Sequence, residues 1–189
     1  MTSGTGSEIL AESQAVLHGA DCLFSAVQVE AALDSMATDI NTQFANKVPV
    51  LLGVMVGGVV PLGRLLRRFV FPLQVDYVHA SRYREEISGG TLRWLKRPDI
   101  ALRDRHVLII DDVLDEGLTL QAIVEACRAE GAAEVSTAVL VDKQLQARPG
   151  LDSVDFAGLK AADRYLFGSG MDYKGYLRNV DGIYAVKER

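Results

Sequence analysis

Three carboxylates follow one short apolar run: Asp111, Asp112 and Asp115 come directly after residues 107–110. A branched apolar run bounded by turn residues predicts a buried strand of a parallel sheet. Ligands of open α/β sheets bind beyond the carboxyl ends of the strands, which is where these acids would lie. Carboxylates this close repel one another, so we expect a cation or a hydroxyl-rich ligand to satisfy them.

A glycine-containing turn at residues 115–119 separates these acids from a helical pattern that begins near Leu118. The first turn of a helix has backbone N–H groups without intrahelical partners, and such groups bind phosphate. Thr119 adds a hydroxyl to the same turn. One segment therefore provides carboxylates for a sugar or a metal ion and amides for a phosphate.

Residues 107–120 consist of four apolar residues, two acids, two apolar residues and then Asp-x-Gly-x-Thr. This pattern resembles the phosphoribosyl-diphosphate-binding motif of the type I phosphoribosyltransferases. The resemblance implies that Asp111 and Asp112 hold the ribose hydroxyls, directly or through Mg²⁺, and that Asp115 is the general base for the purine N7 proton. It also implies that the 5-phosphate is bound by the turn residues Glu116, Gly117, Leu118 and Thr119.

Two of these positions depart from the family pattern. Leu118 stands where many relatives have a basic residue, and Glu116 places a carboxylate in the phosphate turn. We therefore predict that backbone N–H groups bind the phosphate, and that the Glu116 side chain points away from it.

A second glycine-bearing segment, Val56, Gly57 and Gly58, follows the apolar run of residues 48–55. Small residues let backbone amides approach an anion closely. The equivalent loop in the purine-salvage branch of the family contacts the diphosphate of the substrate. Val56 stands at the usual basic position of that loop, so we predict diphosphate binding through backbone N–H groups. The alternative is that the glycines only allow close packing of a strand against a helix.

Residues 81–91 are polar and contain two adjacent glycines. The Ser81-Arg82-Tyr83 element resembles the mobile catalytic loop of hypoxanthine-guanine phosphoribosyltransferases, which implies catalytic roles for Ser81 and Tyr83. Closure of such a loop would exclude water from a cationic transition state. A solvated hairpin is the alternative.

Lys143 follows a later apolar run, and a lysine at this place in the resembling enzymes donates to the exocyclic oxygen of a 6-oxopurine. A group that only donates suits O6 of hypoxanthine or guanine and not the amino group of adenine. Residues 163–173 resemble the family's base-binding and metal segment. The resemblance implies that Tyr165 stacks on the purine, that the Leu166 backbone reads the base edge, that Asp172 contacts the base site and a second Mg²⁺, and that Arg178 binds diphosphate. A surface lysine, core aromatic residues and a surface Asp and Arg are the alternatives.

The order of the predicted elements is typical of an α/β protein with a parallel sheet flanked by helices. Helices are predicted from Ser7, where Ser7 caps, and over residues 25–44, near 59–69 and over 118–130, with Gly131 ending the last one. Strands are predicted at residues 48–55, 73–79, 92–95, 107–110, 135–141, 154–158, 164–167 and 182–186.

We predict one domain over residues 1–189, with a core of about 47–147. A small hood subdomain is expected from residues 1–46 together with 148–189, placed over the ends of the main strands. This architecture is that of the type I phosphoribosyltransferases, which the resemblance covers from about residue 48 to 183.

Composition narrows the class of protein further. The chain has 189 residues, 49% of them hydrophobic, and a net charge of −5, which gives no support for a nucleic-acid surface. Its apolar runs are too short for a membrane span, and the N-terminal residues lack the pattern of a signal peptide, so a cytoplasmic location is expected. Cys22 and Cys127 lack metal-ligand spacing, so buried reduced thiols are predicted.

The resemblance implies a purine-salvage glycosyltransferase that makes IMP or GMP from hypoxanthine or guanine and phosphoribosyl diphosphate, with release of diphosphate. Mg²⁺ is the expected cofactor, and a homodimer or homotetramer without nucleic-acid or membrane partners is the expected assembly. Two alternatives stay open. One is a xanthine-preferring or orotate enzyme, and the other is a regulator of the same fold that binds nucleic acid.

Overall fold

The main layer of the molecule is a six-stranded sheet. The computed structural model describes residues 5–82 and 92–187. The strand order is β4-β3-β2-β5-β6-β7, in which β4 is antiparallel to β3 and the other neighbours are parallel. The strands are β2 (Val50–Met55), β3 (Gln74–Arg82), β4 (Leu92–Lys96), β5 (His106–Leu114), β6 (Glu134–Gln144) and β7 (Phe156–Ala162). This mixed, mostly parallel α/β sheet confirms the predicted fold class.

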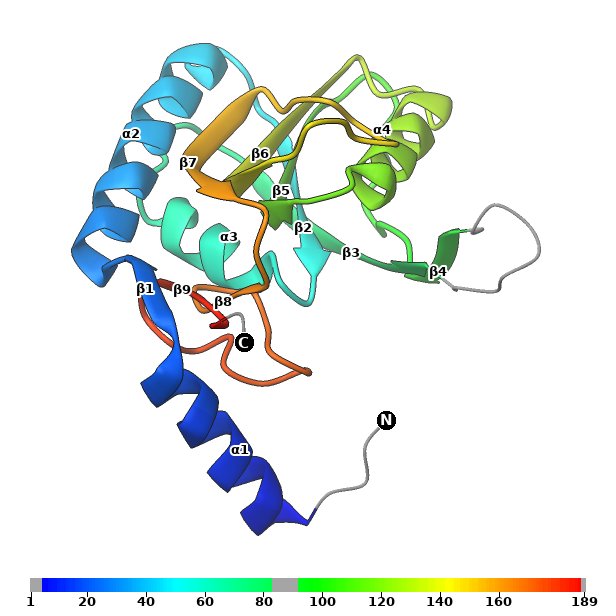
Figure 1. The fold of residues 1–189 in the computed structure, drawn as a ribbon. Helices are drawn as coiled ribbons and strands as arrows, with labels where there is room; N and C mark the ends of the chain where they lie inside the picture. The colour runs from blue at the N-terminus through cyan, green and yellow to red at the C-terminus, as the bar shows by residue number, and fades with distance from the viewer. Residues whose placement is uncertain (1–4, 83–91, 188–189) are drawn as a thin grey trace.

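Helices cover both faces of the sheet (Figure 1). α2 (Ala26–Phe44) and α3 (Val59–Leu66) pack on one face, and α4 (Leu118–Ala129) packs on the other. Side chains of a strand alternate between faces, and β5 follows this rule. Leu108 and Ile110 join the core under α2 and α3, whereas Val107 and Ile109 join the core under α4. The central strand is therefore buried on both sides, as its continuous apolar run predicts.

A three-stranded antiparallel sheet forms a second, smaller layer, with the order β1-β9-β8. Its strands are β1 (Asp21–Phe24), β8 (Leu166–Phe167) and β9 (Ile183–Ala185). This sheet joins segments from the two ends of the chain, and Figure 1 shows it below the carboxyl end of β7.

Two elements whose residues fall in the predicted hood pack on the main sheet. β7 pairs with β6 in the main sheet, and α2 packs on that sheet through Val29, Leu33 and Ile40. Both elements fall within the predicted hood, since they lie outside residues 47–147. Their apolar side chains are buried against the main sheet, however, so they belong to its core. The division of the chain into one domain with a hood stays a prediction.

The first helix, α1 (Gly6–Gly19), begins one residue earlier than predicted. Thr5 is its N-cap rather than Ser7, and the Thr5 N–H donates to Glu8 Oε2 at 2.7 Å. Such a reciprocal pair satisfies N–H groups that the first helical turn leaves without partners. α1 has no buried residue and projects away from the body of the molecule (Figure 1).

The strands that carry site residues are longer than predicted. Asp111 and Asp112 lie within β5 rather than after it, because β6 pairs with β5 as far as Leu114. The other neighbour, β2, pairs with β5 only as far as Ile110. The two acids therefore lie beside an open edge that β2 leaves uncovered. Lys143 likewise lies inside β6, where it is paired with a residue of β7.

Ser81 lies in β3 and pairs with Arg93 of β4, so the predicted loop begins later than Ser81. Pairing of the two antiparallel strands extends β3 to Arg82. Tyr83 and the remainder of the predicted loop, residues 84–91, lie outside the described residues.

Cys127 is buried as predicted, but the prediction for Cys22 is wrong, because this thiol is exposed. Cys22 lies in β1, an edge strand that pairs only with β9 in its sheet. Across residues 5–82 and 92–187, no helix is long and apolar enough to span a bilayer.

Candidate active site

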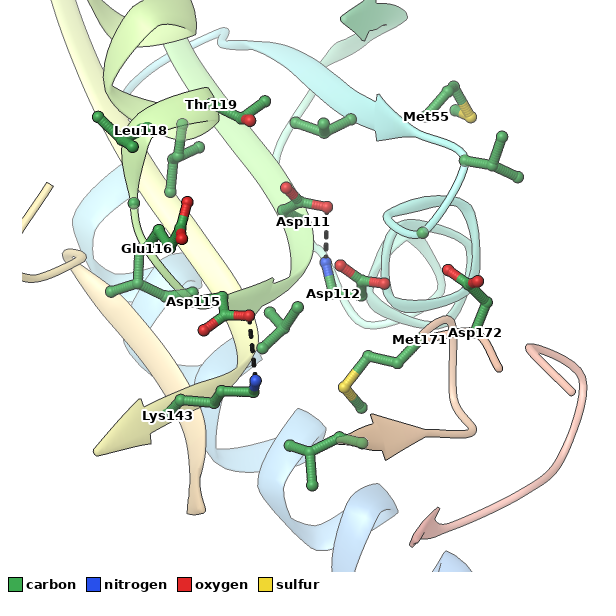
Figure 2. A pocket seen from close by; sticks show the side chains of 18 of the residues that line it. Met55, Asp111, Asp112, Asp115, Glu116, Leu118, Thr119, Lys143, Met171 and Asp172 are labelled. Atoms are coloured by element: carbon green, nitrogen blue, oxygen red, sulfur yellow. Dashed lines mark hydrogen bonds and ion pairs between the residues drawn. The ribbon is translucent and has the colours of Figure 1, made fainter. Parts of the chain in front are cut away.

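A cavity of about 490 Å³ opens at the carboxyl ends of β2 and β5 (Figure 2). Among the predicted site residues whose side chains the structure describes, it brings together all except Gly58. Its lining residues are Val54, Met55, Val56, Gly57, Asp111, Asp112, Val113, Leu114, Asp115, Glu116, Gly117, Leu118, Thr119, Leu120, Lys143, Tyr165, Leu166, Met171, Asp172 and Arg178. The segments meet there because parallel strands present their carboxyl ends at the same edge of the sheet.

The turn at residues 115–119 leads from β5 into α4, and Gly117 is the N-cap of that helix. Gly117 has φ +76°, a left-handed conformation that disfavours side chains. A Cβ atom at Gly117 would also lie 2.5 Å from the backbone oxygen of Leu151. The positive φ and the short distance to Leu151 are thus two separate reasons why this position requires glycine. The turn aims the N-terminus of α4 at the cavity, which is the geometry of an anion site.

Asp111 and Asp112 form a desolvated carboxylate pair at the cavity wall. Burial raises the pKa of Asp111 well above its usual range, and the charge of Asp112 raises it further. Burial also raises the pKa of Asp112, although Asp111 and the Arg178 guanidinium oppose that rise. Double ionisation of the pair is costly without a counter-charge or hydrogen-bond donors. The pair is therefore suited to a cation or to the hydroxyls of a sugar.

Arg178 connects two acids of the cavity. Its Nη2 lies 2.6 Å from Asp172 Oδ1, and its Nη1 lies 3.7 Å from Asp112 Oδ2. Nη1 also donates to the backbone oxygen of Gly170 at 2.7 Å. The Asp172 carboxylate accepts a further hydrogen bond from the Gly175 N–H at 2.6 Å. The guanidinium is thus held at the cavity wall with its planar fork directed at carboxylates, a geometry that also suits phosphate oxygens.

Lys143 and Asp115 face each other across the floor of the cavity (Figure 2). Lys143 Nζ donates to Asp115 Oδ2 at 3.0 Å and lies 3.5 Å from Asp163 Oδ1. The Lys143 side chain is 11% exposed, whereas the Asp115 side chain is 50% exposed. A nearly buried ammonium therefore lies beside a carboxylate that is open to a ligand. An ammonium donor beside a carboxylate acceptor can bind a ligand edge on which an acceptor atom adjoins an N–H group.

The segment after β2 contributes Val56 and Gly57 to the cavity. The Met55–Val56 peptide bond is cis, and Val56 is 49% exposed. A Cβ atom at Gly57 would lie 2.0 Å from Asp112 Oδ2, so only glycine allows this loop to lie against the acid pair.

Gly58 has a different place from the one predicted. It does not line the cavity, and its N–H donates to the backbone oxygen of Val54 at 2.8 Å. A Cβ atom there would lie 2.6 Å from the backbone oxygen of Ile110. Gly58 thus allows close packing between the start of α3 and the strands, which is the structural alternative for this glycine.

The aromatic part of the site comes from the C-terminal segment. Tyr165 is 53% exposed, and its ring meets Tyr173 edge-on with 5.8 Å between centroids. Leu166 is buried in β8 beside it. An open ring at the cavity rim, held at its edge by a second ring, is available to stack on a planar ligand.

Sequence reasoning gave no individual role to Asp163, although it lies in the predicted base-binding segment, and it missed Arg148. Asp163 is the second carboxylate beside Lys143. Arg148 lies in the irregular segment after β6 and donates to the backbone oxygen of Asp115 at 2.9 Å. No spacing in the sequence connects either residue with its partner, because the contacts arise only when β5, β6 and the following segment come together.

Within the described part of the chain, no three or more His, Cys, Asp or Glu side chains form a group that could hold a metal ion alone. This donor set is still compatible with Mg²⁺, which is commonly bound by one or two carboxylates together with water and substrate oxygens. The desolvated Asp111–Asp112 pair fits that description.

Comparison with known proteins identifies the class to which this fold and site belong. The model of the phosphoribosyl transferase domain family matches residues 20–173. A hypoxanthine phosphoribosyltransferase from Staphylococcus aureus has a similar solved structure, with a TM-score of 0.83 at 23% identity, covering 88% of this chain and 91% of that one. The fold and the site thus define a phosphoribosyltransferase.

Sequence relatives narrow the class. Hypoxanthine-guanine phosphoribosyltransferase of Mycoplasma pneumoniae is 31% identical over 159 residues, which are 81% of this chain and 87% of the relative. Hypoxanthine-guanine-xanthine phosphoribosyltransferase of Tritrichomonas foetus is 27% identical over 166 residues, 88% and 91% of the two chains. The chain belongs to the hypoxanthine-guanine phosphoribosyltransferase family of phosphoribosyl transferase domains.

Proposed function

We propose that this protein transfers the 5-phosphoribosyl group of phosphoribosyl diphosphate to N9 of hypoxanthine or guanine, giving IMP or GMP and diphosphate. The observation that carries the proposal is the juxtaposition of Lys143 and Asp115, 3.0 Å apart, in a cavity that also contains the phosphate turn and the acid pair. Each part of the two substrates thus has a chemically matched group in one place.

The bond from C1′ of the ribose to N9 forms while the bond from C1′ to the diphosphate oxygen breaks, and the diphosphate leaves with the electron pair. The transition state has oxocarbenium character, as at other glycosidic centres. Asp115 accepts the N7 proton of the base, and Lys143 donates to O6. Tyr165 stacks on the base, and the Leu166 backbone reads its edge. Ser81, in the last part of β3, and Tyr83, which follows it closely in the sequence, have catalytic roles.

The other half of the site holds the phosphates. The turn residues Glu116, Gly117, Leu118 and Thr119 bind the 5-phosphate, mainly through their N–H groups at the start of α4. Arg178, Val56 and Gly57 contact the diphosphate, with the geometry around Gly58 supporting the position of that loop. Asp111 and Asp112 hold the ribose hydroxyls.

Mg²⁺ is the proposed cofactor, with Asp111 and Asp112 as its protein ligands and Asp172 as a ligand of a second ion. When bound, it would neutralise negative charge on the diphosphate. The salt bridge between Arg178 and Asp172 supports a shared role in this region, because the same guanidinium also lies near Asp112.

A substrate panel tests the proposal: hypoxanthine, guanine, xanthine, adenine and orotate, each with phosphoribosyl diphosphate and Mg²⁺. We expect nucleotide formation from hypoxanthine and guanine. Activity on none of the five bases would refute the enzyme assignment, and activity on adenine alone would refute the role of Lys143.

Xanthine is the second candidate substrate, and one observation favours it. The Tritrichomonas foetus relative is a hypoxanthine-guanine-xanthine phosphoribosyltransferase. The same panel separates the two possibilities through the ratio of kcat/KM for xanthine to that for guanine. A homodimer or homotetramer in the cytoplasm is the proposed assembly and location, and sedimentation would measure the assembly.

A further inference from the structure

Arg148 does not line the cavity, but its side chain, which is 9% exposed, contacts two segments of the active site. Its Nε donates to the backbone oxygen of Asp115 at 2.9 Å, and its Nη2 donates to the backbone oxygen of Lys143. Nη1 donates to the backbone oxygen of Asp152 at 2.7 Å, and Nη2 also pairs with the Asp142 carboxylate. The guanidinium thus makes four contacts from one rigid plane.

Two of these contacts fall where the strands stop pairing. The last β5–β6 pair is Leu114 with Asp142, so Asp115 and Lys143 are the next residues of their segments. Past this point the ladder between β5 and β6 no longer sets the distance between the two backbones. The planar fork of Arg148 spans both carbonyls and fixes that distance. On the cavity side, the same two residues place Nζ and Oδ2 3.0 Å apart.

We propose that Arg148 is a positioning residue that sets the separation between the Asp115 carboxylate and the Lys143 ammonium, and thereby the recognition of the N7 and O6 edge of a 6-oxopurine. The proposal rests on the proposed function, because the two side chains are assigned to those atoms there. Arg148 does not line the cavity, so it acts through the two backbones and not by touching the substrate.

The phosphate turn has supports of its own. The Gly150 N–H donates to the backbone oxygen of Glu116 at 3.0 Å, and the Leu151 N–H donates to that of Gly117 at 3.3 Å. Neither bond uses the guanidinium. Loss of the guanidinium should therefore disturb the base half of the site more than the 5-phosphate half.

Arg148→Lys and Arg148→Met test this separation. Calorimetry would measure the Kd of IMP and of ribose 5-phosphate, and steady-state kinetics would measure kcat and KM for hypoxanthine and KM for phosphoribosyl diphosphate. For Arg148→Met, we expect the Kd of IMP and kcat/KM for hypoxanthine to worsen at least ~10-fold, the size of a lost charge-assisted contact. Ribose 5-phosphate Kd and phosphoribosyl diphosphate KM should change less than about threefold, because backbone bonds hold the turn.

Arg148→Lys should recover part of the loss, because an ammonium keeps the charge but lacks the fork that reaches both carbonyls. It also keeps a cation beside Asp142, so it provides a folded variant if Arg148→Met does not fold. The control is Arg68→Met. Arg68 pairs with Glu30 and Asp34 and donates to the backbone oxygen of Arg64, away from the cavity.

The control variant Arg68→Met should lower the unfolding temperature without changing the ratio of IMP affinity to ribose 5-phosphate affinity. If the wild-type protein is active and neither Arg148 variant changes the ratio of IMP to ribose 5-phosphate affinity, the positioning role is overturned and the proposed function stays intact. Equal weakening of both ligands would also overturn it, because that result describes a general structural role. A wild-type protein that neither binds IMP nor uses any base of the panel would overturn both proposals.

Discussion

Asp115 is the side chain on which the proposed chemistry depends most directly. Asp115→Asn keeps the shape of the side chain but removes the proton acceptor. Loss of a general base costs roughly 10²- to 10⁴-fold, so we expect kcat for hypoxanthine to fall by at least about 100-fold. The Kd of phosphoribosyl diphosphate, measured by calorimetry, should change less than about threefold, because Thr119 and the turn amides are retained. An unchanged kcat would remove the general-base role.

Asp163→Asn is the matched control for that experiment. Asp163 lies 3.5 Å from the same Lys143 ammonium but does not line the cavity. Its loss should leave kcat within about fivefold of wild type, because an ion pair with an exposed carboxylate contributes at most ~1 kcal/mol. If both variants lose turnover equally, the effect of Asp115→Asn acts through Lys143 and not through proton transfer.

The two thiols should differ sharply in reactivity. Burial raises the pKa of Cys127 to about 11, whereas Cys22 is exposed. The thiolate is the reactive form, so Ellman's reagent at pH 8 should modify Cys22 and spare Cys127 until the protein is denatured. Cys22→Ser should show no reactive thiol in the native state. Rapid native labelling of Cys22→Ser would contradict the burial of Cys127.

The raised pKa of Cys127 also predicts an alkaline loss of stability. A group whose pKa is higher in the folded state contributes stability that is present below its unfolded pKa and is lost as pH rises through the folded value. For Cys127 that window runs from about 9 to about 11, and its full size is on the order of 3 kcal/mol. The difference in urea midpoint between wild type and Cys127→Ala should therefore decrease between pH 8.5 and 10.5. A constant difference would show that the thiol ionises as easily in the folded protein.

At the scale of the elements, the connection between β5 and α4 depends on one glycine. Gly117→Ala should lower the free energy of unfolding by roughly 1–3 kcal/mol, because alanine is strained at φ +76°. Its Cβ would also displace Leu151, and with it the turn that faces the phosphate. We therefore expect weaker binding of ribose 5-phosphate, measured by calorimetry alongside urea unfolding.

Gly63→Ala is the control for the turn, because Gly63 lies within α3 and a Cβ atom there meets no atom within 4 Å. Alanine is favoured over glycine inside a helix by roughly 0.5–1 kcal/mol, so this variant should be slightly more stable than wild type. Equal behaviour of the two variants would mean that the turn does not require glycine.

The sequence predicted elements better than it predicted their ends. The strand-helix alternation and the apolar run before Asp111 predicted the sheet and its central strand, because a buried strand has a local pattern. Asp111 was nevertheless placed after β5 and not inside it, because pairing with β6 extends the strand. β1 was missed, since its four residues form a strand only through pairing with β9 near the other end of the chain.

At the scale of the molecule, site residues within one contiguous motif could be predicted from sequence more directly than residues that only the fold brings together. The motif at residues 111–119 is contiguous, so its place in the cavity could be predicted from sequence. Lys143, Tyr165 and Arg178 were found by resemblance, and the fold then brought them to the same cavity. Arg148 was not found, because its carbonyl partners carry no side-chain signal and lie up to 33 residues away in the chain.

The helix α1 is the part of the molecule whose removal should matter least to the fold. It lies before the region that matches the family model, has no buried residue, and contacts the body through Glu12, whose carboxylate accepts from Tyr173 Oη at 3.0 Å and Lys174 Nζ at 2.6 Å.

Deleting residues 1–19 leaves β1 intact and removes these exposed contacts. Fully exposed ion pairs contribute little to stability, so the urea midpoint should change little, while circular dichroism at 222 nm should lose the signal of one helix. Amide exchange in α1 of the full chain should be fast for the same reason. A loss of several kcal/mol on deletion would instead mean that α1 packs against another surface in solution.

The contact of α1 with Tyr173 also leads to the active site, because the Tyr173 ring meets the edge of Tyr165. Glu12→Gln should therefore raise the KM for hypoxanthine by no more than ~5-fold, the equivalent of one exposed ion pair.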